Sequence, residues 1–402
     1  MVITAVQCMT AVGLDAMSTA TAVRAGISAL RVSEQYDDSL GEPIIEACMP
    51  LQPADVADEV AAQDIEAADD DPSPYDEADE DETASGDADA EAAEDEEDEE
   101  DIYGLARQAD DVERVRDAAR RCLAQLLDER FGDARASNRT VRLFLGAAPP
   151  DRPGPRFEGD EDELARELTA ILRTRWQRAE SEVIRTGHAA AIHALQLAAA
   201  GLNRDPASLY IVGAVDSLVA QETLNWYEDA QRLKSGSFGR HQGIAPAEGV
   251  GFLVVETEAS ARRAGRPVLA TIAGMGLAAE PHPFVSDQPC QAQGLTEACV
   301  SALGDAGVAG QEIGAVLCDL DGEFHRSKEW ALTEIRCFGT ASERTLLHPA
   351  DCYGTVGASS AAVLLTIGAA GLSGGWLKRP TLVFCSDDTG ECGAVVLTPP
   401  SA

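Results

Sequence analysis

The sequence predicts an α/β protein in which helices cover central sheets. Apolar runs typical of strands alternate with helical segments along the chain, and the two halves of the sequence repeat this order in a similar way. The 402 residues are long for one domain and suit two halves that share a core. The hydrophobic content of 45% is that of a globular protein, so the chain can bury such a core.

The first half opens with an apolar strand at 2–5, a turn at Gly13 and a helix at 17–25. Beyond an acidic segment, apolar runs predict strands and helical periodicity predicts helices. We expect helices at 111–129, 162–177, 189–200, 217–227 and 259–264, and strands at 141–146, 209–215 and 251–256, with a further strand ending at 183–184.

The second half repeats the alternation of strands and helices. We expect strands at 268–276, 315–320, 381–385 and 393–397, and helices at 294–303, 327–338 and 357–370. We place the boundary between the halves near residue 256. Residues 1–256 then form an N-terminal half and residues 257–402 a C-terminal half.

The net charge of −39 at pH 7 is concentrated in one segment. Between Asp55 and Asp101 lie 25 Asp and Glu residues, and no Lys or Arg occurs between Arg31 and Arg107. Such a segment is too charged to bury a core, so we predict a disordered acidic insertion at about 52–101 in the N-terminal half. This insertion is either a solvated loop or a docking surface for a basic partner. The sequence has no basic cluster that would predict nucleic-acid binding.

The cysteines favour a reduced, cytoplasmic protein. None of the 10 belongs to a C-x-x-C pair or to a Cys/His spacing typical of zinc, so we expect no metal and no cofactor. The N-terminus lacks the basic region of a signal peptide. Residues 352–377 are uncharged and long enough to span a bilayer, but Gly, Ser and Thr interrupt them. We therefore expect a buried helix there and no membrane segment.

Residues 183–200, VIRTGHAAAIHALQLAAA, predict a strand, a tight turn and a helix in direct succession. Thr186 and Gly187 form the turn, and His188 lies at the N-terminus of the helix. Free N–H groups and the helix dipole stabilise an anion at such an elbow, so a fold can present a nucleophile there. The same dipole lowers the pKa of an imidazole, so we expect His188 to be neutral and able to act as a base.

This elbow resembles the active-site elbow of β-ketoacyl-ACP synthases and their thiolase-fold relatives, roughly T-A-C-A-S/T-G, with histidine in the place of cysteine. Weaker similarities follow in the family's order and spacing, at residues 3–4, 10–13, 24–30, 212–217, 247–251, 354–358 and 393–397. The resemblance implies an α/β, thiolase-like fold of five αβαβα layers, built from two pseudo-symmetric halves.

The family's catalytic set is one cysteine and two histidines, and this sequence differs at all three positions. His188 takes the place of the cysteine. Counting back from the F-G pair at 338–339 puts Asp319 at the first histidine, and the second falls at Gly354. An imidazole holds no stable thioester, and Asp319 would repel a malonyl carboxylate. We therefore expect the chain to lack condensing activity, which leaves open whether it is an enzyme at all.

Two interpretations of these degenerate positions stay open. If His188 and Asp319 occupy the family's positions, they face each other. With Cys352 nearby they could form a nucleophile, a base and an orienting group for acyl or thioester hydrolysis. Alternatively, a His–Asp hydrogen bond only fills the vacated cavity. His325 follows Asp319 closely enough in the sequence to be a further candidate.

The resemblance implies a homodimer or a heterodimer with a ketosynthase, paired along the strand at 208–215, with acyl carrier protein as a further partner. We expect Trp226 and Tyr227 to pack at the subunit interface and Glu248 to accept backbone N–H groups. Three functions remain. The first is a non-condensing ketosynthase-like protein of fatty-acid or polyketide-type metabolism that binds acyl groups or carrier protein, or partners an active ketosynthase. The second is an acyl-thioester transferase or hydrolase using His188 and Asp319, and the third is a non-enzymatic interaction protein.

Overall fold

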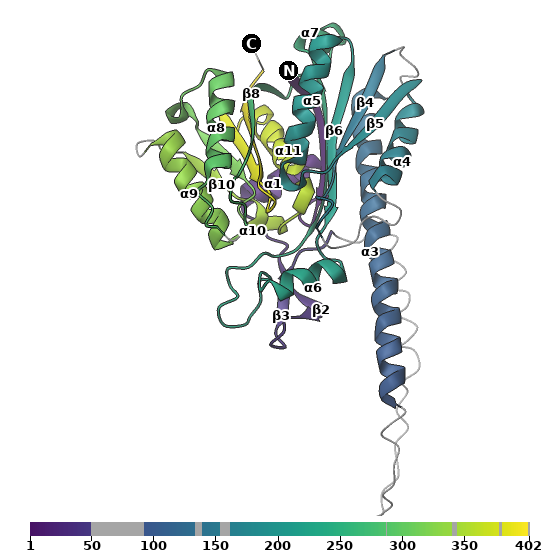
Figure 1. The fold of residues 1–402 in the computed structure, drawn as a ribbon. Helices are drawn as coiled ribbons and strands as arrows, with labels where there is room; N and C mark the ends of the chain where they lie inside the picture. The colour runs from purple at the N-terminus through teal and green to yellow at the C-terminus, as the bar shows by residue number, and fades with distance from the viewer. Residues whose placement is uncertain are drawn as a thin grey trace, which may run out of the picture. The chain divides into compact units, whose positions relative to one another are not determined.

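The computed structural model describes residues 1–49, 92–132, 139–152, 161–286, 288–339, 344–377 and 380–400 (Figure 1). Residues 108–402 and 1–49 form one compact unit, and residues 50–107 are a separate unit. Most of the predicted acidic insertion, up to residue 91, lies outside the described residues. Its last ten residues belong to the helix α3 (Ala92–Phe131), which begins earlier than the sequence analysis expects.

The N-terminal half contributes five strands to the main sheet: β1 (Val2–Thr10), β4 (Thr140–Gly146), β5 (Arg178–Ile184), β6 (Leu209–Ser217) and β7 (Glu248–Glu256). They lie in the order β5-β4-β6-β7-β1. The first three are parallel, and β7 runs antiparallel to both β6 and β1. All nine residues of β6 and of β7 are buried, as expected of strands covered on both faces.

The C-terminal half repeats this arrangement with β8 (Ala270–Ala279), β9 (Ala315–Cys318), β10 (Thr345–Leu347), β11 (Thr381–Ser386) and β12 (Glu391–Thr398). Their order is β10-β9-β11-β12-β8. Again the first three strands are parallel and the last two antiparallel to their neighbours. Two residue pairs between β1 and β8 join the halves. The two pseudo-symmetric halves predicted from the sequence are therefore confirmed.

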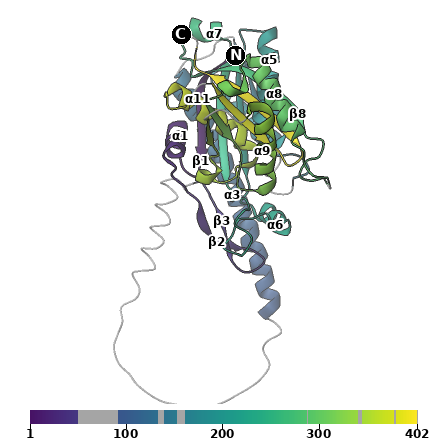
Figure 2. The ribbon, with the colours of Figure 1, turned by 90° about the vertical axis from the view of Figure 1, so that its left-hand side faces the viewer.

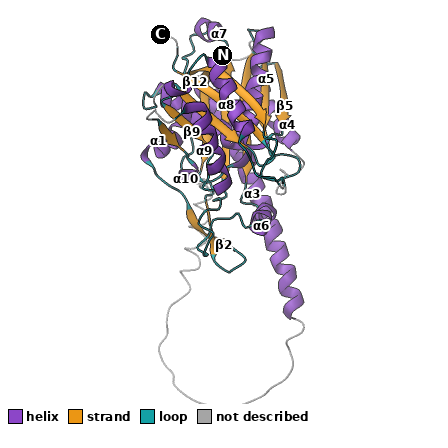
Figure 3. Ribbon diagram, turned by 60° about the vertical axis from the view of Figure 1, so that its left-hand side comes forward, coloured by secondary structure: helices purple, strands orange, loops and turns teal. Residues whose placement is uncertain are grey.

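Helices form three layers around the two sets of strands (Figures 1 and 3). Between the sets lie α5 (Ala190–Arg204) and α11 (Ser360–Ser373), in one apolar cluster with strands of both halves. The outer face of the N-terminal half is covered by α3 and α4 (Glu161–Arg173). The outer face of the C-terminal half is covered by α8 (Gln293–Ala306) and α9 (Phe324–Phe338). The five αβαβα layers are confirmed.

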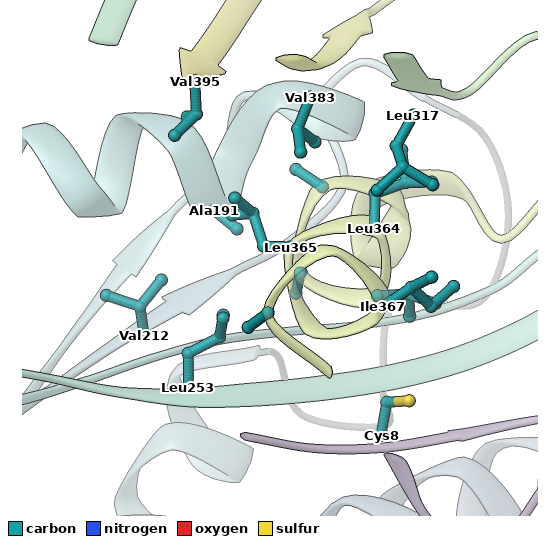
Figure 4. Close-up of a cluster of buried hydrophobic side chains, with 14 of the residues drawn as sticks. Cys8, Ala191, Val212, Leu253, Leu317, Leu364, Leu365, Ile367, Val383 and Val395 are labelled. Atoms are coloured by element: carbon teal, nitrogen blue, oxygen red, sulfur yellow. The ribbon is translucent and has the colours of Figure 1, made fainter. Parts of the chain in front are cut away.

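The helix α11 explains the uncharged stretch at 352–377. Every residue from Ser360 to Leu372 is buried, because the helix has a sheet on either side. Figure 4 shows its side chains between Leu317, Val383 and Val395 of one half and Val212 and Leu253 of the other. Among the described residues, no helix combines the length and the apolar character that crossing a bilayer requires.

The remaining elements are short. They are α1 (Ala16–Ala25), β2 (Arg31–Asp37), β3 (Pro43–Glu46), α6 (Gln221–Asp229), α7 (Glu258–Arg263) and α10 (Ala350–Tyr353). Asp15 caps α1, which packs against α11 (Figure 2). The sequence analysis does not predict β2, β3, β10 or α10.

One expectation about dimerisation is wrong. The strand at 208–215, proposed there as the pairing edge, is β6, and β6 has β4 on one side and β7 on the other. Its backbone groups are therefore already paired within the chain. The edge of the sheet in the N-terminal half is β5, which pairs with β4 alone among the described strands.

Candidate functional site

The elbow that carries His188 is built around Gly187. This glycine has a φ of 57°, and a Cβ in its place would collide with the carboxylate of Asp387. A short 3-10 turn, η1 (Gly187–Ala189), then leads directly into α5. The carboxylate of Asp387, which follows β11, accepts the backbone N–H of His188 at 3.1 Å. The N-terminal half therefore supplies the elbow, and the C-terminal half supplies the acid that caps it.

A second elbow repeats this geometry in the other half. Gly357 has a φ of 53°, and it leads through the 3-10 turn η3 (Gly357–Ser359) into α11. Asp216, in β6, accepts the backbone N–H of Ala358 at 2.6 Å. Arg152 pairs with both oxygens of Asp216, at 2.5 and 2.6 Å. Each half thus caps the elbow of the other half with an aspartate from an equivalent strand.

The side chains of His188 and Asp319 meet, as the sequence analysis expects. Nδ1 of His188 lies 3.0 Å from Oδ2 of Asp319, and both residues are buried. The same carboxylate oxygen accepts the backbone N–H of Ser386 at 3.1 Å and lies 3.6 Å from the guanidinium of Arg326. The position of the carboxylate is therefore fixed from three sides.

The expectation of a neutral, base-competent His188 is not supported. Burial and the nearby charge of Arg326 oppose protonation, but the hydrogen bond and charge of Asp319, with the charge of Asp387, outweigh them and raise the pKa of His188. With both ring nitrogens protonated, Nδ1 donates its hydrogen bond to Asp319.

Behind Asp319 lies a buried network of two arginines and three further acids. Arg232 binds both oxygens of Glu323 at 2.7 and 2.8 Å, and it binds Asp388 at 2.6 Å. Arg326 lies 3.1 Å from Asp388 and 3.2 Å from Asp321. Burial raises the pKa of Asp321 to about 6, although the charge of Arg326 opposes this shift. With Asp319 the network has four carboxyl groups for two guanidinium groups. Burial also opposes the charge of Asp388, but the charges of Arg326 and Arg232 and the hydrogen bond of His325 outweigh it and hold the pKa of Asp388 well below its usual value.

A small pocket lies beside His188. Its internal volume is about 60 Å³, which is room for roughly four water molecules. Trp226, Tyr227 and Val285 form apolar walls, and the polar part of the lining includes Asp387. A second pocket of about 240 Å³, which shares Asp387 and Asp388 with it, adjoins this space.

Three other residues singled out in the sequence lie apart from this pocket. Cys352 is in the central apolar cluster, and burial raises the pKa of its thiol. Gly354, at the position of the second family histidine, ends α10 with a φ of 79° and touches Ala245 and Ala247, which leaves no room for a side chain. His325 lines a neighbouring pocket, where its ring packs against that of Phe284 at a tilt of 31°, with 4.2 Å between the ring centroids. Within the described residues, no hydrogen bond joins Cys352 to His188 or Asp319, and the triad with Cys352 stays a prediction.

Two further expectations have different outcomes. Tyr227 is buried within the chain, and Trp226 is half-buried beside it in the same small cluster, so their place at a subunit interface stays a prediction. Arg232 lies over both rings. Glu248, in contrast, is fully buried and accepts the backbone N–H of Met49 at 3.0 Å, as expected of a structural acceptor. It is also paired with Arg114.

The sequence analysis misses Arg326, Asp387 and the pair of Arg152 with Asp216. The signal for Asp387 is the S-D-D-T-G stretch at 386–390, where two acids follow a buried strand at a turn. Nothing local marks Arg326, because its role depends on carboxylates that the fold brings together from several segments.

One group of side chains in the described part of the chain has the donor atoms of a metal site. Glu280, Cys290 and Glu329 offer oxygen and sulfur atoms within 4.8 Å of one another. Glu280, however, accepts the backbone N–H of Gly294 at 2.8 Å at the start of α8, and Glu329 accepts the hydroxyl of Ser386 at 2.6 Å. These contacts give both carboxyl groups a structural role.

Comparisons with known proteins identify the fold. No family model and no curated protein matches the sequence. Solved structures match over the whole chain. The ishigamide ketosynthase/chain length factor has a TM-score of 0.68 and 18% identity, with 100% of this chain and 99% of that chain covered. The ketosynthase ApeO in complex with its chain length factor ApeC, from Xenorhabdus doucetiae, has a TM-score of 0.67 and 13% identity, with 99% and 98% covered.

A third match is AntDE:AntF, a type II polyketide synthase acyl-carrier protein in complex with its ketosynthase bound to the hexaketide. It has a TM-score of 0.69 and 14% identity, with 99% of both chains covered. The chain therefore has the thiolase-like fold of ketosynthases and chain length factors.

Proposed function

We propose that this chain is a non-condensing subunit that pairs with an active ketosynthase in polyketide or fatty-acid type assembly. The observation that carries the proposal is the closed His188–Asp319 contact at the elbow, 3.0 Å long and buried. A ketosynthase needs a thiolate there to hold the acyl group and imidazoles to bind the malonyl group. This chain offers an imidazole, a carboxylate and a glycine at those three positions.

The size of the pocket favours partnership over acyl binding. Space for roughly four water molecules beside His188 does not accommodate a growing acyl chain. The fold is nevertheless retained with both halves complete. A chain that keeps the fold but has little space beside His188 suits a subunit that binds a partner through its surface and does not bind a substrate in its pocket. Two of the matched structures are named as a ketosynthase with a chain length factor, which agrees with this role.

The alternative as a hydrolase or transferase is less well supported. A general base must be neutral at the working pH, whereas contact with Asp319 raises the pKa of His188. Cys352, the third residue of that alternative, is not among the residues that line the pocket and lies in the apolar core. The interaction-protein alternative depends on residues 52–91, which lie outside the described residues.

The edge strand β5 is the surface through which we expect the partner to bind. It is seven residues long, its outer edge is unpaired among the described strands, and Ser181 lies at its centre, half-buried. A partner strand can add to such an edge through backbone hydrogen bonds. The other edge strand, β10, has only three residues.

The experiment is co-expression with a ketosynthase that has an intact cysteine elbow, from the same genome, and sedimentation of the purified pair. We expect a 1:1 heterodimer. Ser181→Lys puts an ammonium group at the pairing edge and should weaken the heterodimer at least tenfold, about 1.4 kcal/mol. Ser327→Lys, the same change at an exposed position of α9, is the matched control and should have no effect. A heterodimer that tolerates both substitutions equally contradicts the assignment of this edge.

A further inference from the structure

The helices α8 and α9 pack against each other on the outer face of the C-terminal half (Figure 1) and bring two thiols together. Cys299 lies in α8, and Cys337 lies in the last turn of α9. Both are free cysteines, and their side chains hydrogen-bond to each other. Sγ of Cys337 also lies 3.8 Å from the carbonyl oxygen of Thr296, which precedes Cys299 by nearly one turn of α8. The two sulfur atoms therefore meet at the contact between the helices.

Neighbouring contacts hold α8 and α9 together at this level. The guanidinium of Arg336 donates to the carbonyl oxygens of Gln291 and Ala292, at 2.7 and 3.1 Å, at the start of α8. The hydroxyl groups of Thr296 and Thr333 lie 3.3 Å apart. The folded chain thus keeps the two thiols beside each other without a covalent bond between them.

The two thiols differ in accessibility. Cys299 is buried, whereas Cys337 is half-buried and can be reached by a small reagent. The hydrogen bond with Cys299 and the charge of Arg336 lower the pKa of Cys337, although burial opposes them. At the other two half-buried cysteines the direction is opposite, because burial raises the pKa of Cys48 to about 12 and that of Cys290 to about 11. The thiolate is the form that reacts with oxidants, so Cys337 is the thiol that reacts first.

We propose that Cys299 and Cys337 are a modification site, a dithiol that a peroxide oxidises to a disulfide between α8 and α9. Cys337 is the thiol that meets the oxidant, and Cys299 is the thiol that closes the bond. The elbow of His188 and the strand β5 belong to the other half of the chain. This inference therefore does not rest on the proposed partnership.

The reaction balances with hydrogen peroxide as the oxidant. The thiolate of Cys337 attacks one peroxide oxygen, an S–O bond forms as the O–O bond breaks, and the hydroxide that leaves takes up a proton to become water. The sulfur of Cys299 then attacks the sulfenic acid, an S–S bond replaces the S–O bond, and a second water leaves with the thiol proton. Two thiols lose two electrons and two protons, and one peroxide is reduced to two molecules of water.

The test is mass spectrometry of the folded wild-type protein after reduction and exposure to an equimolar amount of hydrogen peroxide. We expect the intact mass to fall by that of two hydrogen atoms and to return with dithiothreitol. Trypsin releases Cys337 in the peptide 337–344 and Cys299 in the peptide 264–326, which also contains Cys290 and Cys318. After alkylation of the remaining thiols, these two peptides should be joined, and fragmentation should place the bond at Cys299.

Two variants separate the roles of the thiols. Cys299→Ala removes the thiol that closes the bond, so we expect no joined peptides and a sulfenic acid at Cys337 that dimedone traps. Cys290→Ser removes a half-buried thiol from the same tryptic peptide and is the matched control. It should form the bond as the wild type does. In the native wild type, iodoacetamide should label Cys337 roughly tenfold faster than Cys290.

The wild type alone can overturn the proposal, so the result does not depend on the folding of Cys299→Ala. An unchanged intact mass after peroxide contradicts it. A bond from Cys337 to Cys290 or Cys318 contradicts it as well, and so does oxidation of Cys337 to a sulfinic acid with no bond to Cys299. Equal labelling of Cys337 and Cys290 by iodoacetamide contradicts the role of Cys337 as the first thiol to react.

Discussion

The contact between His188 and Asp319 joins the two halves of the chain through buried side chains. His188 lies at the elbow before α5, and Asp319 follows β9 of the other half. Both side chains are buried, and the carboxylate of Asp319 also accepts the backbone N–H of Ser386. We therefore expect these residues to contribute to stability in this protein.

A double-mutant cycle measures that contribution. Asp319→Ala leaves a buried imidazole without its acceptor and should lower the free energy of unfolding by about 1–3 kcal/mol. Adding His188→Ala should cost little more, because the two residues belong to one network. Chemical denaturation of the wild type, both single variants and the double variant gives the coupling energy. A coupling near zero means that the two side chains do not interact in solution.

The pH dependence of stability follows from the raised pKa of His188. The protonated ring bound to Asp319 stabilises the folded state below the usual histidine pKa of 6.5, and this contribution is lost as the pH rises through the raised value. The difference in unfolding free energy between the wild type and Asp319→Asn should therefore be largest below pH 6.5 and shrink at higher pH. Urea denaturation across this range measures it. Asp321 also titrates in this region, so a control is needed that removes the histidine. In a His188→Gln background, the difference in unfolding free energy between Asp319 and Asp319→Asn should not vary between pH 6.5 and 8.5.

At this level the sequence predicts which residues meet but not what surrounds them. The position of Asp319 follows from counting along a family motif, and the contact with His188 is present. The pKa of His188 could not be predicted, because it depends on Asp387 and Arg326, which come from other elements and are marked by no local pattern. Gly354 could be assigned to its position, whereas the contacts that exclude a side chain there come from the loop at 245–247.

Among the helices and strands, the central ones were predictable and the short ones were not. The strands β6, β7, β11 and β12 and the helix α11 are long apolar runs, because both of their faces are covered. β2 is mostly exposed and rich in charged residues, and β10 has three residues, so neither has an apolar pattern.

α3 begins at Ala92 because Ala and Glu favour helices even where their charge suggests a disordered segment. The apolar pattern also does not show which strand lies at the edge of the sheet. The sequence analysis expects β6 to be the pairing edge, whereas the sheet order puts β6 inside the sheet and β5 at its edge.

The whole molecule has the two-fold architecture of the thiolase-like fold, and a buried contact between His188 and Asp319 lies at its first elbow. Both halves have the same strand order, and each caps the elbow of the other with an aspartate. This exchange ties the halves together at the place where the related fold performs its chemistry. The architecture is thus compatible with the partnership that we propose.

The measurement that tests this account most directly is condensation of an acyl thioester with malonyl thioester, followed by mass spectrometry of the product. The chain alone, and the chain with His188→Cys, should form no product, because Asp319 and Gly354 supply no imidazole to the malonyl group. The complex with an active ketosynthase should form product, lose this activity when the partner's cysteine is replaced, and keep it with His188→Ala. Product formed by the chain alone and abolished by His188→Ala would contradict the account.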